Sequence, residues 1–228
     1  QRSILQYAIQ GKLVEQREEY GTAEELYMHI QEEKKKLIKE GKIKKTKDLP
    51  EITEDEIPFD IPENWKWVRL GEIIELLSGQ DFSPDKYNDM NKGIPYITGA
   101  SNISDKGVII NRWTNEPRCI ANDGDVILVC KGSGYGKTVI CDVDEAHVAR
   151  QIMVIKKSDF LNMKYLKFFL NAIHYLIKSW GQGVIPGIDR NNVLNALFPL
   201  PPLAEQKRIV EKIEELLPYT KQLAKKPD

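Results

Sequence analysis

The spacing of apolar residues changes twice along the chain, and this change constrains the fold more than any other feature of the sequence. From residue 1 to about 45, over 162–178 and after 201, apolar residues recur every three or four positions, as on one face of a helix. Between 65 and 155 they form short β-branched and aromatic runs separated by Gly, Asn and Asp, which is typical of strands. The sequence predicts an α+β fold, in which a mixed or antiparallel β-sheet is flanked by N-terminal helices and a C-terminal coiled-coil-type helix.

These changes predict four parts: a helical segment at 1–45, a linker at 46–64, a sheet domain at 65–200 and a last helix at 201–228. The linker combines three prolines with a run of acids and shows no periodicity, which disfavours regular structure. The expected strands of the sheet domain are the runs at 93–98, 107–110, 125–130, 138–141 and 151–155.

Two helices are expected in the N-terminal segment. Leu5, Ile9 and Leu13 recur every four residues and give the first helix an apolar face. Thr22 followed by Glu25 fits a capping box at the start of the second, in which hydroxyl and carboxylate each bind a free backbone N–H. Gly41 is placed to end this helix.

The last helix is expected to begin at Pro201 and Pro202, because proline fits a first helical turn. Its apolar residues follow the 4-3-4-3 spacing of a coiled-coil seam: Ile209, Ile213, Leu216, Thr220 and Leu223. Pro218 should kink or end the regular part. An isolated seam of this kind predicts self-association.

Composition excludes several classes of protein. The 228 residues are 41% hydrophobic and carry 33 Lys+Arg against 34 Asp+Glu, which suits a globular chain with a core. No apolar run reaches the roughly 20 residues of a membrane span, and no secretory signal follows the first residue. Cys119, Cys130 and Cys141 form no C-x-x-C pair, so we expect a reduced, cytoplasmic setting.

Charge is strongly local. Eight lysines and one acid lie between residues 34 and 47, whereas 66–200 carries 16 bases and 14 acids. The central region is therefore not the basic block expected of a protein that grips DNA by bulk charge alone. The lysine run fits a solvated helix end as well as a phosphate-binding arm, and a purely structural adaptor that uses it to contact proteins stays an alternative.

Residues 132–138 resemble a nucleotide-binding loop, but the spacing is wrong. Such a loop needs G-x-x-x-x-G-K-[ST] and opens into a helix, whereas Lys131 stands where the first glycine should be and strand-like runs lie on both sides. A nucleotide hydrolase built on these residues is the alternative function. Isolated histidines and cysteines eleven residues apart give no metal-ligand spacing, so no metal site is expected. No nucleophile elbow occurs either, and we expect no catalysis.

Polar, glycine-rich clusters in the sheet domain are the candidate DNA contacts. Lys and Arg can bind guanine, Asn and Gln can bind adenine, and Ser and Thr reach bases or phosphates. Ordinary turn chemistry explains the same residue types. The candidate residues are Thr98, Ser101, Asn102, Lys131, Ser133, Tyr135, Lys137, Arg150, Gln151, Gln182, Arg190 and Asn191.

Three stretches together resemble the specificity subunits of type I restriction–modification systems. The stretch from Leu200 to Val210 resembles the P-L-P-P-L-x-E-Q-x-x-I-V signature that opens a helix of that family. Residues 3–14 resemble its S-I-L-q-x-A-I-x-G-K-L-V stretch, and residues 56–71 resemble its entry into a target-recognition domain.

The resemblance implies a non-catalytic subunit in which each recognition domain reads one half of a split sequence of double-stranded DNA. It implies methyltransferase (M) subunits carrying S-adenosylmethionine, restriction (R) subunits using ATP and Mg, no cofactor in this chain, and no membrane partner. A usual member has two recognition domains, so this chain is either half of a longer protein or a half-subunit forming a homodimer. The expected interface residues, some of which could equally form intramolecular core, are Leu203, Glu205, Gln206, Ile209, Val210, Ile213 and Leu216, with Leu5, Ile9 and Leu13 packing alongside.

Overall fold

The computed structural model describes residues 2–132, 134–179 and 187–223. Contacts divide the chain into two compact units. Unit 1 comprises 1–73, 159–176 and 195–228, and unit 2 comprises 74–158 and 177–194. The four-part division expected from the sequence stays a prediction; by contacts, residues 65–73 and 195–200 group with the terminal helices.

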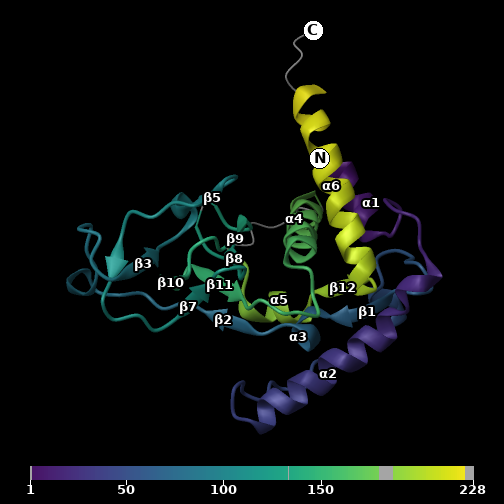
Figure 1. Cartoon of the computed structure of the whole chain (residues 1–228), viewed down its shortest axis with the longest axis horizontal. Coiled ribbons are helices and arrows are strands. Elements are labelled where there is room, and N and C mark those ends of the chain that lie inside the picture. The colour runs from purple at the N-terminus through teal and green to yellow at the C-terminus, as the bar shows by residue number, and fades with distance from the viewer. Residues whose placement is uncertain (1, 133, 180–186, 224–228) are drawn as a thin grey trace. The chain divides into compact units, whose positions relative to one another are not determined.

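Among its described residues, unit 1 combines helices from both ends of the chain with a two-stranded sheet (Figure 1). Its helical elements are α1 (Arg2–Ile9), η1 (Glu18–Tyr20), α2 (Ala23–Lys39), η2 (Glu54–Glu56), α3 (Leu70–Ile73), most of α4 (Met163–Ser179) and α6 (Leu203–Leu223). Its strands β1 (Lys66–Arg69) and β12 (Leu197–Leu200) pair antiparallel, with Lys66 opposite Leu200.

The capping box of α2 is confirmed. The Glu25 N–H donates to Thr22 Oγ1 at 3.3 Å, and the Thr22 N–H donates to Glu25 Oε2 at 3.1 Å. At the other end Gly41 has φ 71°, and Lys42 N donates to Leu37 O at 2.9 Å, which closes the helix as expected.

The first helix is shorter than its apolar spacing predicts. It ends at Ile9, because Gly11 takes a left-handed conformation with φ 69° and Lys12 N turns back to Tyr7 O at 2.9 Å. The expectation that Leu13 continues the helical face is therefore wrong. A Cβ on Gly11 would lie 2.4 Å from Pro62 Cγ. A glycine is therefore required at the point where residues 3–14 approach the 46–64 segment.

The C-terminal helix packs against α1 (Figure 1). Ile209, Val210 and Ile213 are buried in unit 1, as are Leu5 and Ile9 of α1. The helix continues through Pro218 to Leu223, so of the two effects expected of this proline, an end of the helix is wrong and a kink stays a prediction. Proline removes only one backbone hydrogen bond, and the helix resumes beyond it.

Unit 2 is built from two four-stranded sheets and a separate hairpin within its described residues. One sheet has the order β6 (Trp113–Thr114), β3 (Ile94–Ile97), β10 (Glu145–Val148), β7 (Ile120–Asn122). The other has the order β2 (Leu76–Ser78), β11 (Ile152–Ile155), β8 (Val126–Val129), β9 (Thr138–Ile140). The hairpin is β4 (Ile103–Ser104) with β5 (Gly107–Val108), and short helical elements are η3 (Pro84–Lys86), η4 (Ala100–Asn102) and the start of α5 (Arg190–Asn195).

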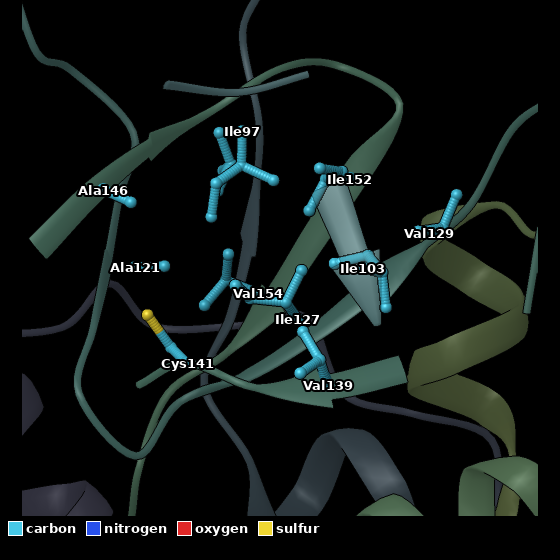
Figure 2. Close-up of a cluster of buried hydrophobic side chains, with 11 residues drawn as sticks. Ile97, Ile103, Ala121, Ile127, Val129, Val139, Cys141, Ala146, Ile152 and Val154 are labelled. Atoms are coloured by element: carbon cyan, nitrogen blue, oxygen red, sulfur yellow. The ribbon is translucent and has the colours of Figure 1, made fainter. Parts of the chain in front are cut away.

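The core of unit 2 lies between the two sheets. Figure 2 shows its side chains gathered from both: Ile97, Ala121 and Ala146 come from one sheet, and Ile127 and Val154 from the other. Because β3 runs parallel to β10 while the other pairs are antiparallel, the first sheet is mixed. The predicted α+β class with a mixed sheet is confirmed.

Candidate nucleic-acid interface

Two of the expected contact segments follow a parallel pair of strands. Residues 98–102 follow β3, and residues 149–151 follow β10, with Ile97 opposite Val148. Parallel strands end at the same edge of a sheet. The N–H of Ala149 donates to Ile97 O at 2.9 Å and holds the two segments side by side.

The turn at 131–137 joins the same edge from the second sheet. Cys130 N donates to Gln151 O at 2.7 Å. A Cβ on Gly134 would lie only 2.2 Å from the Cβ of Ala100, so the turn approaches the 98–102 segment as closely as a glycine permits.

The segment 187–191 also reaches this edge. Ile188 N donates to Cys130 O at 2.8 Å, and Gly187 forms a bridge with Lys131. Arg190 donates to Leu76 O at 2.8 Å and to Ser78 Oγ at 3.2 Å, which fixes the start of α5 on β2. Four clusters that are separate in sequence therefore meet, and we call them the loop edge: 98–102, 131–137, 149–151 and 187–191.

The predicted contact residues differ in exposure at the loop edge. Ser101, Lys131, Lys137, Arg150, Gln151, Arg190 and Asn191 are exposed, Thr98 and Tyr135 are half-buried, and Asn102 is buried. Ser133 and Gln182 lie outside the described residues. The edge thus presents hydrogen-bond donors and acceptors of the kind that groove edges and phosphates bind.

Asn102 supports the loop from inside. Its Oδ1 accepts from the backbone N–H groups of Thr98 and Gly99 at 2.9 and 3.3 Å, and from Thr98 Oγ1 at 3.1 Å. Its Nδ2 donates to Ile109 O at 2.8 Å and to Asn111 Oδ1 at 3.2 Å. With no exposed surface, the amide reaches no external ligand in this conformation, and we revise the expected role of Asn102 from contact to support.

The cations of the loop edge fall into two groups. Arg150 is paired with Asp81 at 2.7 Å, and Arg190 is used on β2. In the part of the chain that the structure describes, no ion pair holds Lys131 or Lys137. These two lysines and the Gln151 amide are therefore the side chains best placed for an external partner.

The nucleotide-binding alternative is not supported by the geometry at 132–138. This segment connects the antiparallel strands β8 and β9, and no helix follows it. Three of its N–H groups are used within the turn: those of Tyr135, Gly136 and Lys137 donate to the carbonyls of Gly132, Val129 and Gly134 at 3.1, 2.7 and 3.1 Å. They do not converge on a site for phosphate.

Burial is the largest cause of the pKa shifts of the three cysteines and of His147 in unit 2. Burial raises the pKa of Cys130 to about 12 and raises those of Cys119 and Cys141. His147 Nε2 lies 2.7 Å from Gln80 O, its Nδ1 faces the N–H of Arg118 and Cys119, each at 3.2 Å, and burial lowers its pKa. Among the described residues, no cluster of three metal-ligating side chains occurs, and no helix is long and apolar enough to cross a membrane.

The expected interface residues lie mostly inside unit 1. Leu203 is exposed and Leu216 half-buried, whereas Glu205, Gln206, Ile209, Val210 and Ile213 are buried. The intramolecular role that the sequence left open therefore describes five of these seven in the single chain. Any contact of theirs with a second subunit stays a prediction.

The supporting roles of Glu205 and Gln206 inside unit 1 are not visible in the sequence patterns. Glu205 accepts hydrogen bonds from Trp65 Nε1 at 3.0 Å, Gln16 Nε2 at 3.1 Å and Asn64 Nδ2 at 3.2 Å. Gln206 accepts from Asn162 N at 2.9 Å. Two of the stretches that resemble the family, 56–71 and the one that contains Glu205, thus meet at one buried carboxylate, together with Gln16, which lies just after the third. The available signal was an acid within an apolar helical stretch, which is buried when it has partners.

Comparison with known proteins points the same way. Residues 62–227 match the family described as "Type I restriction modification DNA specificity domain". The chain is 32% identical to the type I restriction enzyme EcoAI specificity subunit of Escherichia coli, covering 95% of this chain and 39% of the relative. It is 31% identical to the EcoEI specificity subunit of the same organism, covering 97% and 40%. The chain thus spans about two fifths of the length of these relatives.

Solved structures show the same fold. A chain from a study of the assembly and conformational transition of "the type I R-M system" superposes with a TM-score of 0.65 and 25% identity, covering 88% of this chain and 48% of that one. The HsdS subunit from Thermoanaerobacter tengcongensis gives a TM-score of 0.64 at 23% identity, covering 88% and 47%.

Proposed function

Because the chain belongs to the family of type I restriction–modification DNA specificity domains, we propose that it reads one half of a bipartite sequence in double-stranded DNA. Methyltransferase and restriction subunits bound beside it would carry the chemistry, with S-adenosylmethionine, ATP and Mg on those partners. The chain itself would contribute recognition without catalysis, in the cytoplasm.

The single observation that carries this proposal is the convergence of four polar segments at the loop edge of unit 2. Direct readout needs several donors and acceptors held together in a fixed geometry, because each base pair presents a short pattern in the major groove. The edge supplies such a set on a rigid two-sheet core, and the backbone bonds of Cys130 fix two of its segments.

Chemistry suggests how the roles are divided. Lys131 and Lys137 are exposed cations that can donate to phosphate oxygens or to guanine O6 and N7. Gln151 can pair with adenine through its amide, which is exposed between the 98–102 and 131–137 segments. We propose Gln151 as a base reader and Lys137 as a contact to phosphate or guanine.

A selected duplex tests the proposal. Rounds of selection from a random DNA library with the full chain, alone and with its methyltransferase subunits, should enrich one asymmetric half-site. Gln151→Ala should relax the preference at one base pair and cost roughly 10-fold in affinity. Lys137→Ala should weaken binding to all sequences.

The matched control for Lys137→Ala is Lys157→Ala. Lys157 is also exposed, but its backbone N–H binds Asp125 at the start of β8, away from the loop edge. Enrichment of no sequence, or equal effects of Lys137→Ala and Lys157→Ala with no effect of Gln151→Ala, would overturn the assignment.

A second subunit or half-subunit would pair with the free part of α6. Tyr219 is 59% exposed, although it lies on the same helix as the buried Ile209 and Ile213. We propose that α6 beyond Ile213 contacts another helix, either in a homodimer or in the second half of a longer chain. Sedimentation should show a dimer that Leu216→Glu dissociates; a monomer at all concentrations would exclude the homodimer.

A further inference from the structure

The outer face of the first sheet of unit 2 carries an aromatic cluster. Side chains alternate across a strand, and Ile97 and Val148 point into the core between the sheets. Their neighbours Tyr96 and His147, which are paired across β3 and β10, therefore lie on the opposite face. This face is covered by side chains from the 80–92 segment.

The aromatic rings on this face are stacked against one another. Phe82 lies flat on His147 with centroids 4.1 Å apart, and it meets Tyr96 at 5.6 Å. Tyr87 also contacts Tyr96, with ring centroids 5.5 Å apart. Tyr96 is buried, whereas Phe82 and Tyr87 are partly exposed and form the outer layer.

An arginine side chain lies over each of the two outer rings. The Arg112 guanidinium lies 5.0 Å from the centroid of Tyr87, and that of Arg118 lies 5.8 Å from the centroid of Phe82. Both are within the range of a cation–π contact, and both residues are exposed. The rings hold the guanidinium groups at the surface and restrict their rotamers before a ligand binds. Less side-chain entropy is then lost on binding.

Neither arginine has a carboxylate partner among the described residues. Two nearby acids are used elsewhere: Asp81 pairs with Arg150 at 2.7 Å, and Glu116 pairs with Lys86 at 2.8 Å. Two exposed guanidinium groups, each held over a ring and without a carboxylate partner among the described residues, suit phosphate groups, which arginine binds through two parallel hydrogen bonds.

This face is continuous with the loop edge. Asp81, next to Phe82, accepts from the N–H of Arg150 at 3.0 Å, and Arg150 is part of the 149–151 segment. A duplex held at the loop edge therefore has a backbone close to this side of the sheet.

We propose that Arg112 and Arg118, seated on Tyr87 and Phe82, form a phosphate-binding site for the DNA backbone, outside the segments that read bases. The site rests on the proposed function, and it adds affinity without sequence preference. The alternative ligand of these two arginines is a carboxylate-rich surface of another protein, and the test below distinguishes it from DNA.

Salt titration of DNA binding by the full chain is the test. Binding of the selected duplex and of a random-sequence duplex is measured between about 50 and 200 mM KCl. The Arg112→Gln and Arg118→Gln variants should each lose affinity about 5-fold for both duplexes and lower the slope of log K against log salt by about 0.9. The ratio of the two affinities should stay unchanged.

Two further variants make the result specific. Lys157→Gln removes one positive charge at the other end of the unit and should leave the salt slope unchanged. This result would show that the affinity lost by the arginine variants does not come from the change in net charge. Arg112→Lys keeps the charge but loses the planar group, and it should bind less tightly than wild type. Near-UV circular dichroism verifies that each variant is folded.

The outcomes separate this site from the proposed function. If the selected duplex is bound and discriminated but the Arg112→Gln and Arg118→Gln variants keep the wild-type slope, the site is wrong and the function stands. If the variants bind DNA normally but lose co-purifying methyltransferase subunits, the occupant is a protein surface and the site is again wrong. If the wild-type chain binds neither duplex, both proposals fail together.

Discussion

Most of the expected contact residues are buried in unit 1 and exposed in unit 2, although unit 2 also buries polar supports such as Asn102. In unit 1, Glu205, Gln206 and Arg69 are buried and join distant segments of the chain. In unit 2, Lys137 and Gln151 stand at the surface. The stretches that resemble the family are thus mainly internal supports, whereas the side chains suited to recognise DNA lie where a change costs the fold little.

Arg69 shows how thoroughly unit 1 uses a single side chain. It donates to the carbonyls of Pro50, Glu51 and Asn195 at 3.0 to 3.1 Å and pairs with Glu56 at 2.7 Å. Hydrogen bonds from the backbone of Thr53 and from Arg69 lower the pKa of Glu56. The acidic segment is therefore fastened to unit 1 although it has little regular structure.

The largest expected effect is on the stability of unit 1, where buried polar residues join distant segments. Glu205→Ala leaves Trp65 Nε1 and Asn64 Nδ2 without this acceptor, whereas Gln16 Nε2 keeps its hydrogen bond to Gly11 O. We expect a loss of about 3 kcal/mol in the free energy of unfolding, measured by urea denaturation. Glu211→Ala on the exposed side of α6 is the control and should change it by less than about 0.5 kcal/mol. Equal losses would contradict the internal role of Glu205.

A smaller effect is expected for the support of the loop edge. Asn102→Ala removes five hydrogen bonds from the 98–102 segment. The cost should be about 2 kcal/mol in stability, with faster hydrogen exchange in this segment. Ser101→Ala, at the exposed neighbouring position, should leave exchange unchanged. Unaltered exchange in Asn102→Ala would show that the loop holds its shape without the amide.

The contact between two loops can be tested by a pair of substitutions. Gly134→Ala places a methyl group 2.2 Å from the Cβ of Ala100 and should separate the loops, at a cost of about 1 to 2 kcal/mol and with altered base preference. Ala100→Gly removes the obstructing methyl group. The double variant should recover the wild-type preference, and failure to recover it would place the strain elsewhere.

A pH effect is expected in unit 2. Because burial lowers the pKa of His147, the unfolded chain binds the proton more readily than the folded one. Stability should therefore be full above the ordinary histidine pKa of about 6.5 and fall as the pH decreases below it. Urea denaturation at several pH values measures this slope. His147→Gln should flatten it in that range; an unchanged slope would assign the effect to other groups.

The smallest signal comes from the thiols. Cys130, with a pKa raised to about 12, should react with an alkylating reagent at pH 8 far more slowly than a free thiol. The three cysteines all lie in unit 2. Labelling should therefore report the opening of this unit alone, and acceleration by Glu205→Ala would show that the two units unfold together.

Local signals in the sequence predicted the elements well because they act over a few residues. The capping box at Thr22 and the β-branched run at 125–130 depend on near neighbours, and both were confirmed. The burial of Ile209 and Ile213 inside unit 1 was not settled by spacing, because a seam looks the same whether it packs against α1 or another chain.

The geometry of the candidate interface could be predicted only in part, for a similar reason, and its contacts with DNA stay a prediction. Turn-forming polar residues are visible in a sequence, and four such clusters do meet at the loop edge. The inward direction of Asn102 and the aromatic seats of Arg112 and Arg118 depend on pairings between distant strands, such as β3 with β10. These pairings have no local signature.

The interleaved path of the chain has a consequence for engineering and for evolution. Unit 2 is made of 74–158 and 177–194, so the chain enters and leaves it twice. If only 74–158 were grafted into a related protein, the positions equivalent to Arg190 and Asn191 would keep the recipient's residues. These residues would then lie beside loops taken from this chain. Hybrids with a new DNA preference should therefore require exchange of both segments, and a crossover between residues 158 and 177 would combine the longer segment of one parent with the shorter segment of the other.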